Sequence, residues 1–417
     1  MRVEFRTLDA FYELESEDVF AKCRPFSSYL QALKNEGSYP YRRTLLTPCA
    51  NRVVIRDPLT SKPKEMVMMA SNNYLGLTTH PKVIEAGRRA LEEYGTGSGG
   101  VPLLSGTYEL HRALERRIAR FKGCEDAVVF PTGYSTNVGC INALIRPKDI
   151  AINDRLNHAS LIDGCRLSRG TLRIFRHNDM ESLRRVLEYA KGRFAGKLII
   201  VDGVFSMDGD IARLPEIISL ARQYGARVMV DEAHATGVIG KNGRGTPEHF
   251  NLEGQVDIVA GTLSKALGGL GGFVASSQEV VDYVRFYARA YMFSTSLPPV
   301  VAASVLAAID VIEEEPERRA RLHDNIGYML KHLKALGFNT GNTETAIVPL
   351  IIGDDAKVKD LTLDLHQAGI YVNPVFYPAV PKGTARIRLS LMATHTKQDL
   401  DQALDALETL GRKHGII

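Results

Sequence analysis

Features that mark several other classes of protein are missing from this 417-residue sequence. No apolar run approaches the roughly 18 to 20 residues that a membrane-spanning helix requires. The opening segment, MRVEFRTLDAFYELESED, is too acidic for a secretory signal. We therefore expect a cytoplasmic protein.

Cysteine spacing and net charge exclude two further classes. The five cysteines form neither a CxxC pair nor a zinc-ligand pattern, and their odd number is typical of free thiols in a reducing compartment. The sequence therefore predicts no metal site. The 52 Lys and Arg residues barely exceed the 48 Asp and Glu residues and are spread along the chain, so a nucleic-acid partner is not indicated.

The hydrophobic content of 45% is sufficient for a substantial core. Between residues 127 and 275, short apolar strands alternate with helical segments, which predicts an α/β fold with a doubly wound, mostly parallel sheet. A second group of strands and helices from residue 347 predicts a smaller C-terminal α/β domain. We expect an N-terminal arm over 1–65, a large domain over 66–300 and a small domain over 301–417.

Two local expectations concern the ends of this arrangement. The first forty residues predict amphipathic helices over Phe11–Phe20 and Ser27–Glu36, broken at Pro25. The apolar segment Phe273–Ser276 is expected to be an edge strand of the sheet.

Residues 227–272 carry the most informative pattern. Two apolar runs, Val228–Val230 and Val256–Ala260, change abruptly to polar residues, as buried parallel strands do where they leave a sheet. The first run is followed by Asp231 and His234, and the second by Thr262, Ser264, Lys265 and several glycines. Because ligands of α/β folds bind at these strand ends, we expect an acid, an imidazole and a lysine to converge there.

Pyridoxal phosphate requires this set of side chains. It needs a lysine for a Schiff base, a carboxylate that keeps its pyridine nitrogen protonated, and hydroxyl or glycine positions near its phosphate. Taken singly, Asp231 and Lys265 would be ordinary solvated residues at strand ends. Their order and context together predict pyridoxal 5'-phosphate as the cofactor.

The motifs VDEAHATGVIG and GTLSKALGG resemble those of the α-oxoamine synthases, which are fold-type-I pyridoxal phosphate transferases. The resemblance covers nearly the whole chain from about Met69 onward. It implies a fold with a large cofactor-binding domain and a smaller C-terminal domain. It also implies catalytic roles for Lys265, His158, Asp231 and His234.

The resemblance assigns further residues by position. It implies cofactor contacts for Gly133, Tyr134, His158, Ser206, Asp231, His234, Thr262, Lys265 and Ser294, and substrate contacts for Asn73, Tyr74 and Arg388. In the family, the histidine matching His158 stacks on the cofactor ring, and the arginine matching Arg388 binds the amino-acid carboxylate. The serine matching Ser294 reaches the phosphate of the other subunit, which implies a homodimer with active sites at the interface.

The glycine-rich segment GTGSGG also matches the spacing of a dinucleotide fingerprint. A helix precedes it, however, whereas that fingerprint follows a strand, so we reject a nicotinamide cofactor. The family has a glycine-rich loop of this kind at the acyl-donor entrance. Serine palmitoyltransferases and 2-amino-3-ketobutyrate CoA ligases usually carry an arginine where this chain has Val101-Pro102, which leaves a carrier-protein-bound acyl donor open.

The resemblance implies decarboxylative condensation of a small amino acid with an acyl thioester to give an aminoketone. VFSMDGDIARLPE and IRLSLMATHT resemble bacterial serine palmitoyltransferases, which favours L-serine and a long-chain acyl-CoA. FYPAVPKGTARIR and NHASLIDGCRL are also similar to 2-amino-3-ketobutyrate CoA ligases, so glycine with acetyl-CoA is an alternative. A pyridoxal phosphate aminotransferase would share Asp231 and Lys265 and is a further alternative.

Overall fold

A computed structural model of the protein describes residues 9–12 and 15–417. The chain forms two compact units. The larger unit contains residues 72–206 and 210–322, and the smaller one contains the described residues up to Ser71 together with 207–209 and 323–417. The smaller unit includes Val67 and Met68, which pair in parallel with Ile370 and Tyr371 of the C-terminal segment.

The larger unit is built on a seven-stranded sheet with the order β3-β9-β8-β7-β6-β4-β5. Its strands are β3 (Asp126–Phe130), β4 (Ile150–Asp154), β5 (Thr171–Phe175), β6 (Lys197–Asp202), β7 (Arg227–Asp231), β8 (Ile258–Thr262) and β9 (Gly272–Ser276). Strands β5, β4, β6, β7 and β8 are mutually parallel, which confirms the doubly wound, mostly parallel sheet.

The expected position of Phe273–Ser276 at the sheet edge is wrong. Strand β9 lies between β3 and β8 and is antiparallel to both. All five of its residues are buried, as the interior of a sheet requires. An apolar run of this length does not distinguish an interior strand from an edge strand, since the order of strands depends on long-range packing.

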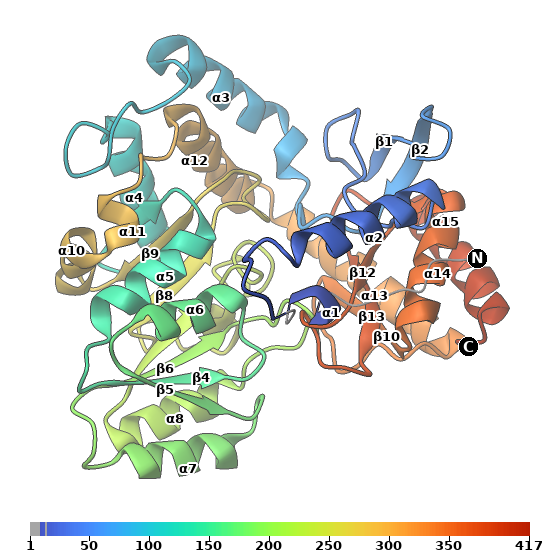
Figure 1. Cartoon of the computed structure of the whole chain (residues 1–417). Helices are drawn as coiled ribbons and strands as arrows, with labels where there is room; N and C mark the ends of the chain where they lie inside the picture. The colour runs from blue at the N-terminus through green and yellow to red at the C-terminus, as the bar shows by residue number, and fades with distance from the viewer. Residues whose placement is uncertain (1–8, 13–14) are drawn as a thin grey trace. The chain divides into compact units, whose positions relative to one another are not determined.

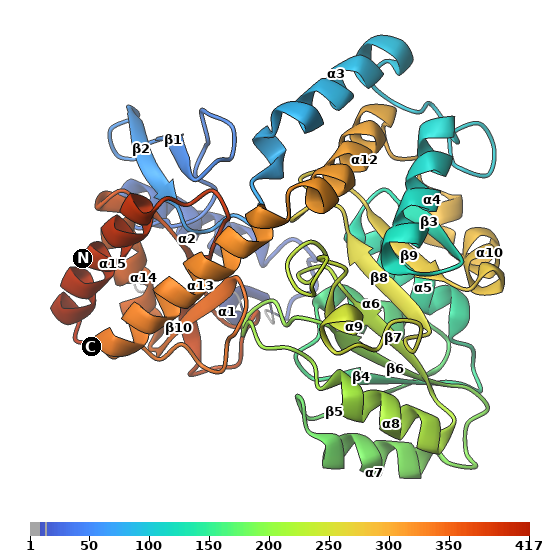
Figure 2. The ribbon, with the colours of Figure 1, turned by 180° about the vertical axis from the view of Figure 1, so that it is seen from behind.

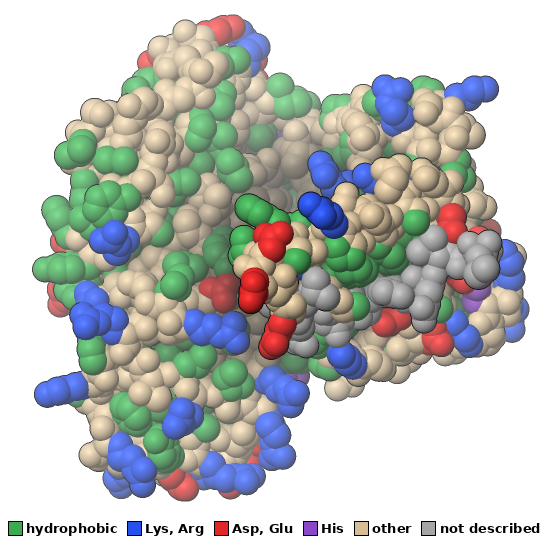
Figure 3. Space-filling view, in the orientation of Figure 1, with side chains coloured by type: hydrophobic (Ala, Val, Ile, Leu, Met, Phe, Trp, Pro, Cys, Tyr) green, Lys and Arg blue, Asp and Glu red, His purple; other side chains and the backbone are tan. Residues whose placement is uncertain are grey.

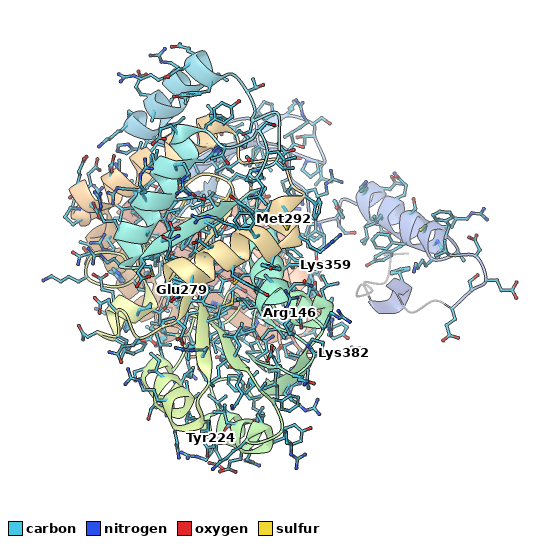
Figure 4. The ribbon with its side chains drawn as sticks, turned by 90° about the vertical axis from the view of Figure 1, so that its left-hand side faces the viewer. Arg146, Tyr224, Glu279, Met292, Lys359 and Lys382 are labelled. Carbon is cyan, nitrogen blue, oxygen red and sulfur yellow. The ribbon has the colours of Figure 1, made fainter. Side chains whose placement is uncertain are left out.

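Both faces of this sheet are covered by helices. Side chains alternate between the two faces along each strand, and the apolar side chains on both faces need to be buried. On β6, Leu198 and Ile200 join one buried cluster, whereas Ile199 and Val201 join another. The first cluster includes side chains from α5 (Gly133–Leu144), α6 (Ala159–Leu167) and α10 (Gln278–Tyr287), and the second includes side chains from α7 (Met180–Ala190) and α8 (Leu214–Tyr224) (Figure 1). From behind, α7 and α8 run side by side (Figure 2). Figure 4 labels Glu279 on α10 and Tyr224 at the end of α8, which mark the helices of the two faces.

The larger unit contains further helices besides those that cover the sheet. They are η1 (Leu77–Thr79), α3 (Pro81–Tyr94), α4 (Glu109–Lys122), α9 (Thr246–His249), α11 (Arg289–Met292) and α12 (Pro299–Glu314), and α13 (Pro316–Leu336) continues into the smaller unit. In the part of the chain that the structure describes, every helix is too short or too polar to cross a membrane.

The smaller unit contains two three-stranded sheets, β1-β2-β11 and β10-β13-β12. Their strands are β1 (Arg52–Arg56), β2 (Pro63–Met68), β10 (Ile347–Gly353), β11 (Ile370–Tyr371), β12 (Asn373–Val375) and β13 (Ala385–Ser390), and its helices include α1 (Asp9–Tyr12), α2 (Cys23–Asn35), α14 (Asp355–Gln367) and α15 (Lys397–Lys413). The pairing of β2 with β11 explains why this unit combines both ends of the chain.

The expected N-terminal helices are only partly correct. A helix over Phe11–Phe20 is wrong for residues 15–20, which lie outside any helix, and residues 13–14 of that range lie outside the described residues. The second helix begins at Cys23, before Pro25, rather than after it. Proline is tolerated there because the first-turn N–H groups have no partner within a helix.

Positive charge is less evenly distributed over the surface than along the sequence. Residues 146–193 contain eleven Lys and Arg but six Asp and Glu. Figure 3 shows Lys and Arg side chains gathered over the region of β5, α6 and α7. The exposed members include Arg155, Arg166, Arg169, Arg173, Arg176, Arg185 and Arg193. The expectation of evenly spread charge is therefore wrong for this face.

Candidate active site

A cavity of about 260 Å³ lies in the larger unit at the carboxyl ends of β6, β7 and β8. Eight of the predicted site residues line it: Gly133, Tyr134, His158, Ser206, Asp231, His234, Thr262 and Lys265. A larger groove of about 540 Å³ lies at the opposite, amino ends of these strands and contains none of them. Chemistry rather than size therefore identifies the candidate site.

Asp231 and Lys265 both line this cavity, as the sequence predicts. Asp231 is the last residue of β7 and is 5% exposed. Its Oδ2 accepts a hydrogen bond from Nδ2 of Asn137 at 2.6 Å, and its Oδ1 accepts one from the backbone N–H of Ala233 at 2.9 Å. Both carboxylate oxygens of Asp231 are therefore held in place by hydrogen bonds.

A second buried carboxyl group, Asp202, lies beside Asp231. It ends β6, pairs in register with Asp231 and also lines the cavity. Its Oδ2 accepts the backbone N–H of His158 at 2.9 Å, and this bond fixes the loop that carries the histidine. Burial and then the charge of Asp231 raise the pKa of the Asp202 carboxyl well above its usual range. Asp202 is not among the predicted site residues, whereas Ser206, four residues later, is and also lines the cavity.

The amino terminus of α5 forms another wall of the cavity. Gly133 and Tyr134 are its first residues, and Thr132 caps the helix by accepting the N–H of Ser135. A Cβ atom at Gly133 would lie 2.9 Å from Oγ1 of Thr262, so glycine allows the start of the helix to pack directly against the end of β8. Helix N-termini bind anions through their unpaired N–H groups and their dipole, which makes this wall suitable for a phosphate.

His234 lines the cavity and is oriented by Tyr74. The Tyr74 hydroxyl shares a 2.7 Å hydrogen bond with Nδ1 of His234 and donates to Oδ1 of Asn72 at 3.1 Å. Tyr74 itself is 1% exposed. The neighbouring predicted residue, Asn73, is buried and donates from its amide to Oγ1 of Thr78 at 2.7 Å. Tyr74 and Asn73 therefore lie outside the cavity lining, and Tyr74 acts on the cavity through His234.

Two predicted residues lie elsewhere. Ser294 belongs to the larger unit, is partly exposed and lies outside the lining of this cavity. Arg388 lies on β13 in the smaller unit, is buried and donates to Oγ of Ser390 at 3.0 Å. Its strand neighbour Arg386 forms an ion pair with Asp208 at 2.7 Å, so Arg386 already has a carboxylate partner.

Sequence reasoning missed two buried polar residues that line the cavity, Asn137 and Ser160. Asn137 lies on the second turn of α5, a helix whose other buried residues are mostly apolar. Ser160 opens α6 directly after His158. A polar residue on the sheet-facing side of an apolar helix is the signal that could have identified Asn137.

These donors and acceptors fit pyridoxal phosphate. A helix N-terminus with Thr262 and Ser264 suits its phosphate, Asp231 suits a protonated ring nitrogen, and Lys265 suits its aldehyde.

Comparison with known proteins identifies the family. The model for "Aminotransferase class I and II" matches residues 64–407. The chain belongs to this family. Within the family, the chain is 45% identical over 388 residues to an 8-amino-7-oxononanoate synthase of Thermoanaerobacter pseudethanolicus, which covers 93% of this chain and 97% of that protein. The predicted fold-type-I pyridoxal phosphate fold and α-oxoamine synthase-like enzyme class are confirmed.

Another relative extends beyond the matched region. The chain is 44% identical over 411 residues to the 4-hydroxy-2,2'-bipyrrole-5-methanol synthase PigH of a Serratia species. The match covers 99% of this chain, which spans 63% of the length of that relative.

Solved structures of this class I and II aminotransferase family include serine palmitoyltransferase of Sphingomonas wittichii. It matches with a TM-score of 0.90 and 37% identity, covering 96% of this chain and all of that chain. An 8-amino-7-oxononanoate synthase of Francisella tularensis matches with a TM-score of 0.73 and 26% identity, covering 84% of this chain and 99% of that chain. The structural likeness thus includes the enzyme that the sequence motifs favour, while the sequence relatives include a different member of the same class.

Proposed function

We propose that the protein condenses a small amino acid with an acyl thioester, using pyridoxal phosphate. A carbon–carbon bond forms between the amino acid α-carbon and the thioester carbonyl carbon, and the thiol leaves. Carbon dioxide leaves from the amino acid, so the product is an aminoketone. The observation that carries the proposal is the meeting of Lys265 and Asp231 in one cavity with a helix N-terminus.

Pyridoxal phosphate, when bound, supplies an electron sink for negative charge at the amino acid α-carbon. In our proposal, Nζ of Lys265 holds the cofactor and, once displaced, removes the α-proton. Asp231 provides the negative charge that keeps the ring nitrogen protonated. His158 would lie against the ring, and His234 would donate to its phenolic oxygen.

The phosphate and the substrate have separate proposed contacts. Gly133, Tyr134, Ser206 and Thr262 contact the cofactor, with the first two at the N-terminus of α5. For the amino acid, we propose that Arg388 binds the carboxylate, because a guanidinium forms paired hydrogen bonds with a carboxylate. Asn73 and Tyr74 are the other proposed substrate contacts.

A homodimer is part of the proposal. Ser294 would reach the phosphate site of the second subunit, so each site would require both chains. The segment leading to Ser294 exposes Phe286, Tyr287 and Phe293 by 60%, 53% and 68%, and exposed apolar clusters of this kind mark interaction surfaces. Sedimentation of the purified protein as a monomer at micromolar concentration would contradict this part.

Two substrate pairs are specific candidates. L-serine with a long-chain acyl-CoA is favoured by the motifs near Arg388 and by the structural match to serine palmitoyltransferase. A reaction of the 8-amino-7-oxononanoate synthase type is favoured by 45% identity over 97% of that relative. That product name places an amino group on the carbon beside a ketone, as this condensation requires. Glycine with acetyl-CoA is a further pair to test.

The decisive experiment is a spectral titration of the cofactor-loaded protein with serine, glycine and alanine. The amino acid that perturbs the spectrum is then combined with acyl-CoAs of several lengths and with acyl carrier protein thioesters, and products are detected by mass. We expect release of one CO₂ and one thiol per aminoketone. Amino-group transfer without thioester consumption would show an aminotransferase and overturn the proposal.

The role of Lys265 has its own test. Borohydride reduction of the cofactor-loaded protein, followed by peptide mass spectrometry, is expected to label Lys265. Labelling of another lysine would contradict the assignment.

A further inference from the structure

The side-chain amide of Asn137, on α5, connects the end of β7 with the start of α6. Its Nδ2 donates to Oδ2 of Asp231 at 2.6 Å and to Oγ of Ser160 at 2.9 Å, and its side chain is buried. An ionised carboxylate only accepts hydrogen bonds, so the amide nitrogen rather than the amide oxygen faces Asp231. Both amide protons of Asn137 are thereby used, one on β7 and one on α6.

Ser160 in turn contacts the imidazole ring of His158. Its hydroxyl oxygen lies 2.8 Å from Nδ1 of His158, and its backbone N–H donates to the same nitrogen at 3.3 Å. A backbone N–H only donates, so Nδ1 of His158 must accept and carries no proton. Since Nδ1 then has no proton to donate, the Ser160 hydroxyl donates to it, while the hydroxyl oxygen accepts from Asn137.

The same contact orients the imidazole ring. His158 is the N-cap residue of α6, and its side chain satisfies the N–H of Ser160 at the start of that helix. Its backbone N–H is held by Asp202. Loss of solvent around the ring lowers the pKa of His158. The charges of Asp231 and Asp163 act in the opposite direction and that of Lys265 in the same direction, and the lowered pKa agrees with an unprotonated Nδ1.

We propose that Asn137 and Ser160 are positioning residues that act together on the two sides of the cavity. Asn137 fixes the orientation of the Asp231 carboxylate, and Ser160 keeps His158 a neutral imidazole with its proton on Nε2. Within the proposed function, a neutral imidazole can lie against a cationic pyridine ring without charge repulsion, while Asp231 supplies the opposite charge. We call the hydrogen-bonded series Asp231, Asn137, Ser160 and His158 the relay. It rests on the proposed function only for the identity of that ring.

A purely structural role is the competing explanation, because both residues also connect α5 to α6. The chain offers a matched control for each residue. Asn142, on the same helix α5, donates from Nδ2 to the backbone oxygen of Leu167 at 2.7 Å. Ser168, just after α6, donates from Oγ to the backbone oxygen of Cys165 at 2.7 Å. Asn142→Leu and Ser168→Ala therefore remove side-chain hydrogen bonds of similar length from α5 and from the end of α6, outside the cavity lining.

The first test is made on cofactor-free protein labelled with ¹⁵N-histidine, so that its readout does not depend on activity. Proton-coupled ¹⁵N spectra report which ring nitrogen of His158 carries the proton, with His158→Gln for assignment. We expect the wild type to show a bare Nδ1 at neutral pH. In Ser160→Ala the titration midpoint of His158 should rise by roughly half to one pH unit, the size expected for one lost hydrogen bond. Ser160→Thr should restore it.

The second test uses the cofactor itself. Asn137→Leu should weaken pyridoxal phosphate binding at least tenfold by equilibrium dialysis, because it removes a hydrogen bond to a charged group. Asn142→Leu and Ser168→Ala should bind as the wild type does. A proton on Nδ1 of His158 in the neutral wild type, or equal effects of site and control variants in both tests, would overturn the relay.

The two proposals fail separately. If the protein shows the predicted His158 spectra but forms no aminoketone from any thioester, the proposed function is wrong and the relay stands. If it forms aminoketone while His158 titrates identically in wild type and Ser160→Ala, the relay is wrong and the function stands.

Discussion

His177 is predicted to stabilise the protein in a strongly pH-dependent way. Its Nδ1 lies 3.0 Å from Oδ1 of Asp154, and its Nε2 lies 2.8 Å from Oδ2 of Asp210. Carboxylates only accept hydrogen bonds, so both ring nitrogens must carry protons. The imidazolium therefore connects the end of β4, which leads to His158, with the segment that follows Ser206.

The magnitude follows from the pKa of His177. Burial alone would lower it, but hydrogen bonds to Asp154 and Asp210 outweigh burial and raise it from 6.5 to about 10. A shift of this size corresponds to at most about 5 kcal/mol, at 1.36 kcal/mol per pKa unit. The side chain is 23% exposed, so solvent screening reduces our expectation to about 2 to 4 kcal/mol.

The direction of the pH dependence follows from the raised pKa. The stabilisation is fully present below pH 6.5, where the unfolded chain is also protonated, and it is lost as pH rises towards about 10. We expect the difference in unfolding free energy between wild type and His177→Gln to shrink steadily over this range.

Urea unfolding of the cofactor-free protein at several pH values between 6 and 10 measures this difference. His249→Gln, which changes an exposed histidine of α9, is the control and should give a constant difference. A constant difference for His177→Gln as well would refute the assignment of an imidazolium between two carboxylates.

Three further predictions concern the site. Tyr74→Phe removes the hydroxyl that orients His234. The loss of this buried hydrogen bond, about 1 to 2 kcal/mol, should lower kcat/KM about tenfold in steady-state assays. Unchanged kinetics would contradict the orienting role of Tyr74. Gly133→Val places side-chain atoms against Thr262 and should weaken pyridoxal phosphate binding at least tenfold by equilibrium dialysis, whereas wild-type affinity would argue against a phosphate at this helix end. Arg388→Ala should raise the amino-acid KM at least tenfold without changing cofactor absorbance, and an unchanged KM would place the carboxylate elsewhere.

Much of the fold could be predicted from local patterns in the sequence. Helix α4 is an example: its apolar residues repeat at helical spacing over Glu109–Lys122, and Gly123 follows in the left-handed conformation that ends a helix. The meeting of Asp231 and Lys265 in one cavity was also predictable, since both follow parallel strands and the carboxyl ends of such strands share one edge of the sheet.

Contacts between distant segments were decided by the tertiary structure alone. Asn137 meets Asp231 across 94 residues because α5 packs on the face of the sheet beside β7, and no local pattern specifies which helix does so. Strand β9 lies inside the sheet rather than at its edge for the same reason. Hydrophobic periodicity depends on neighbours along the chain, whereas strand order and the pairing of buried polar groups depend on how whole elements pack.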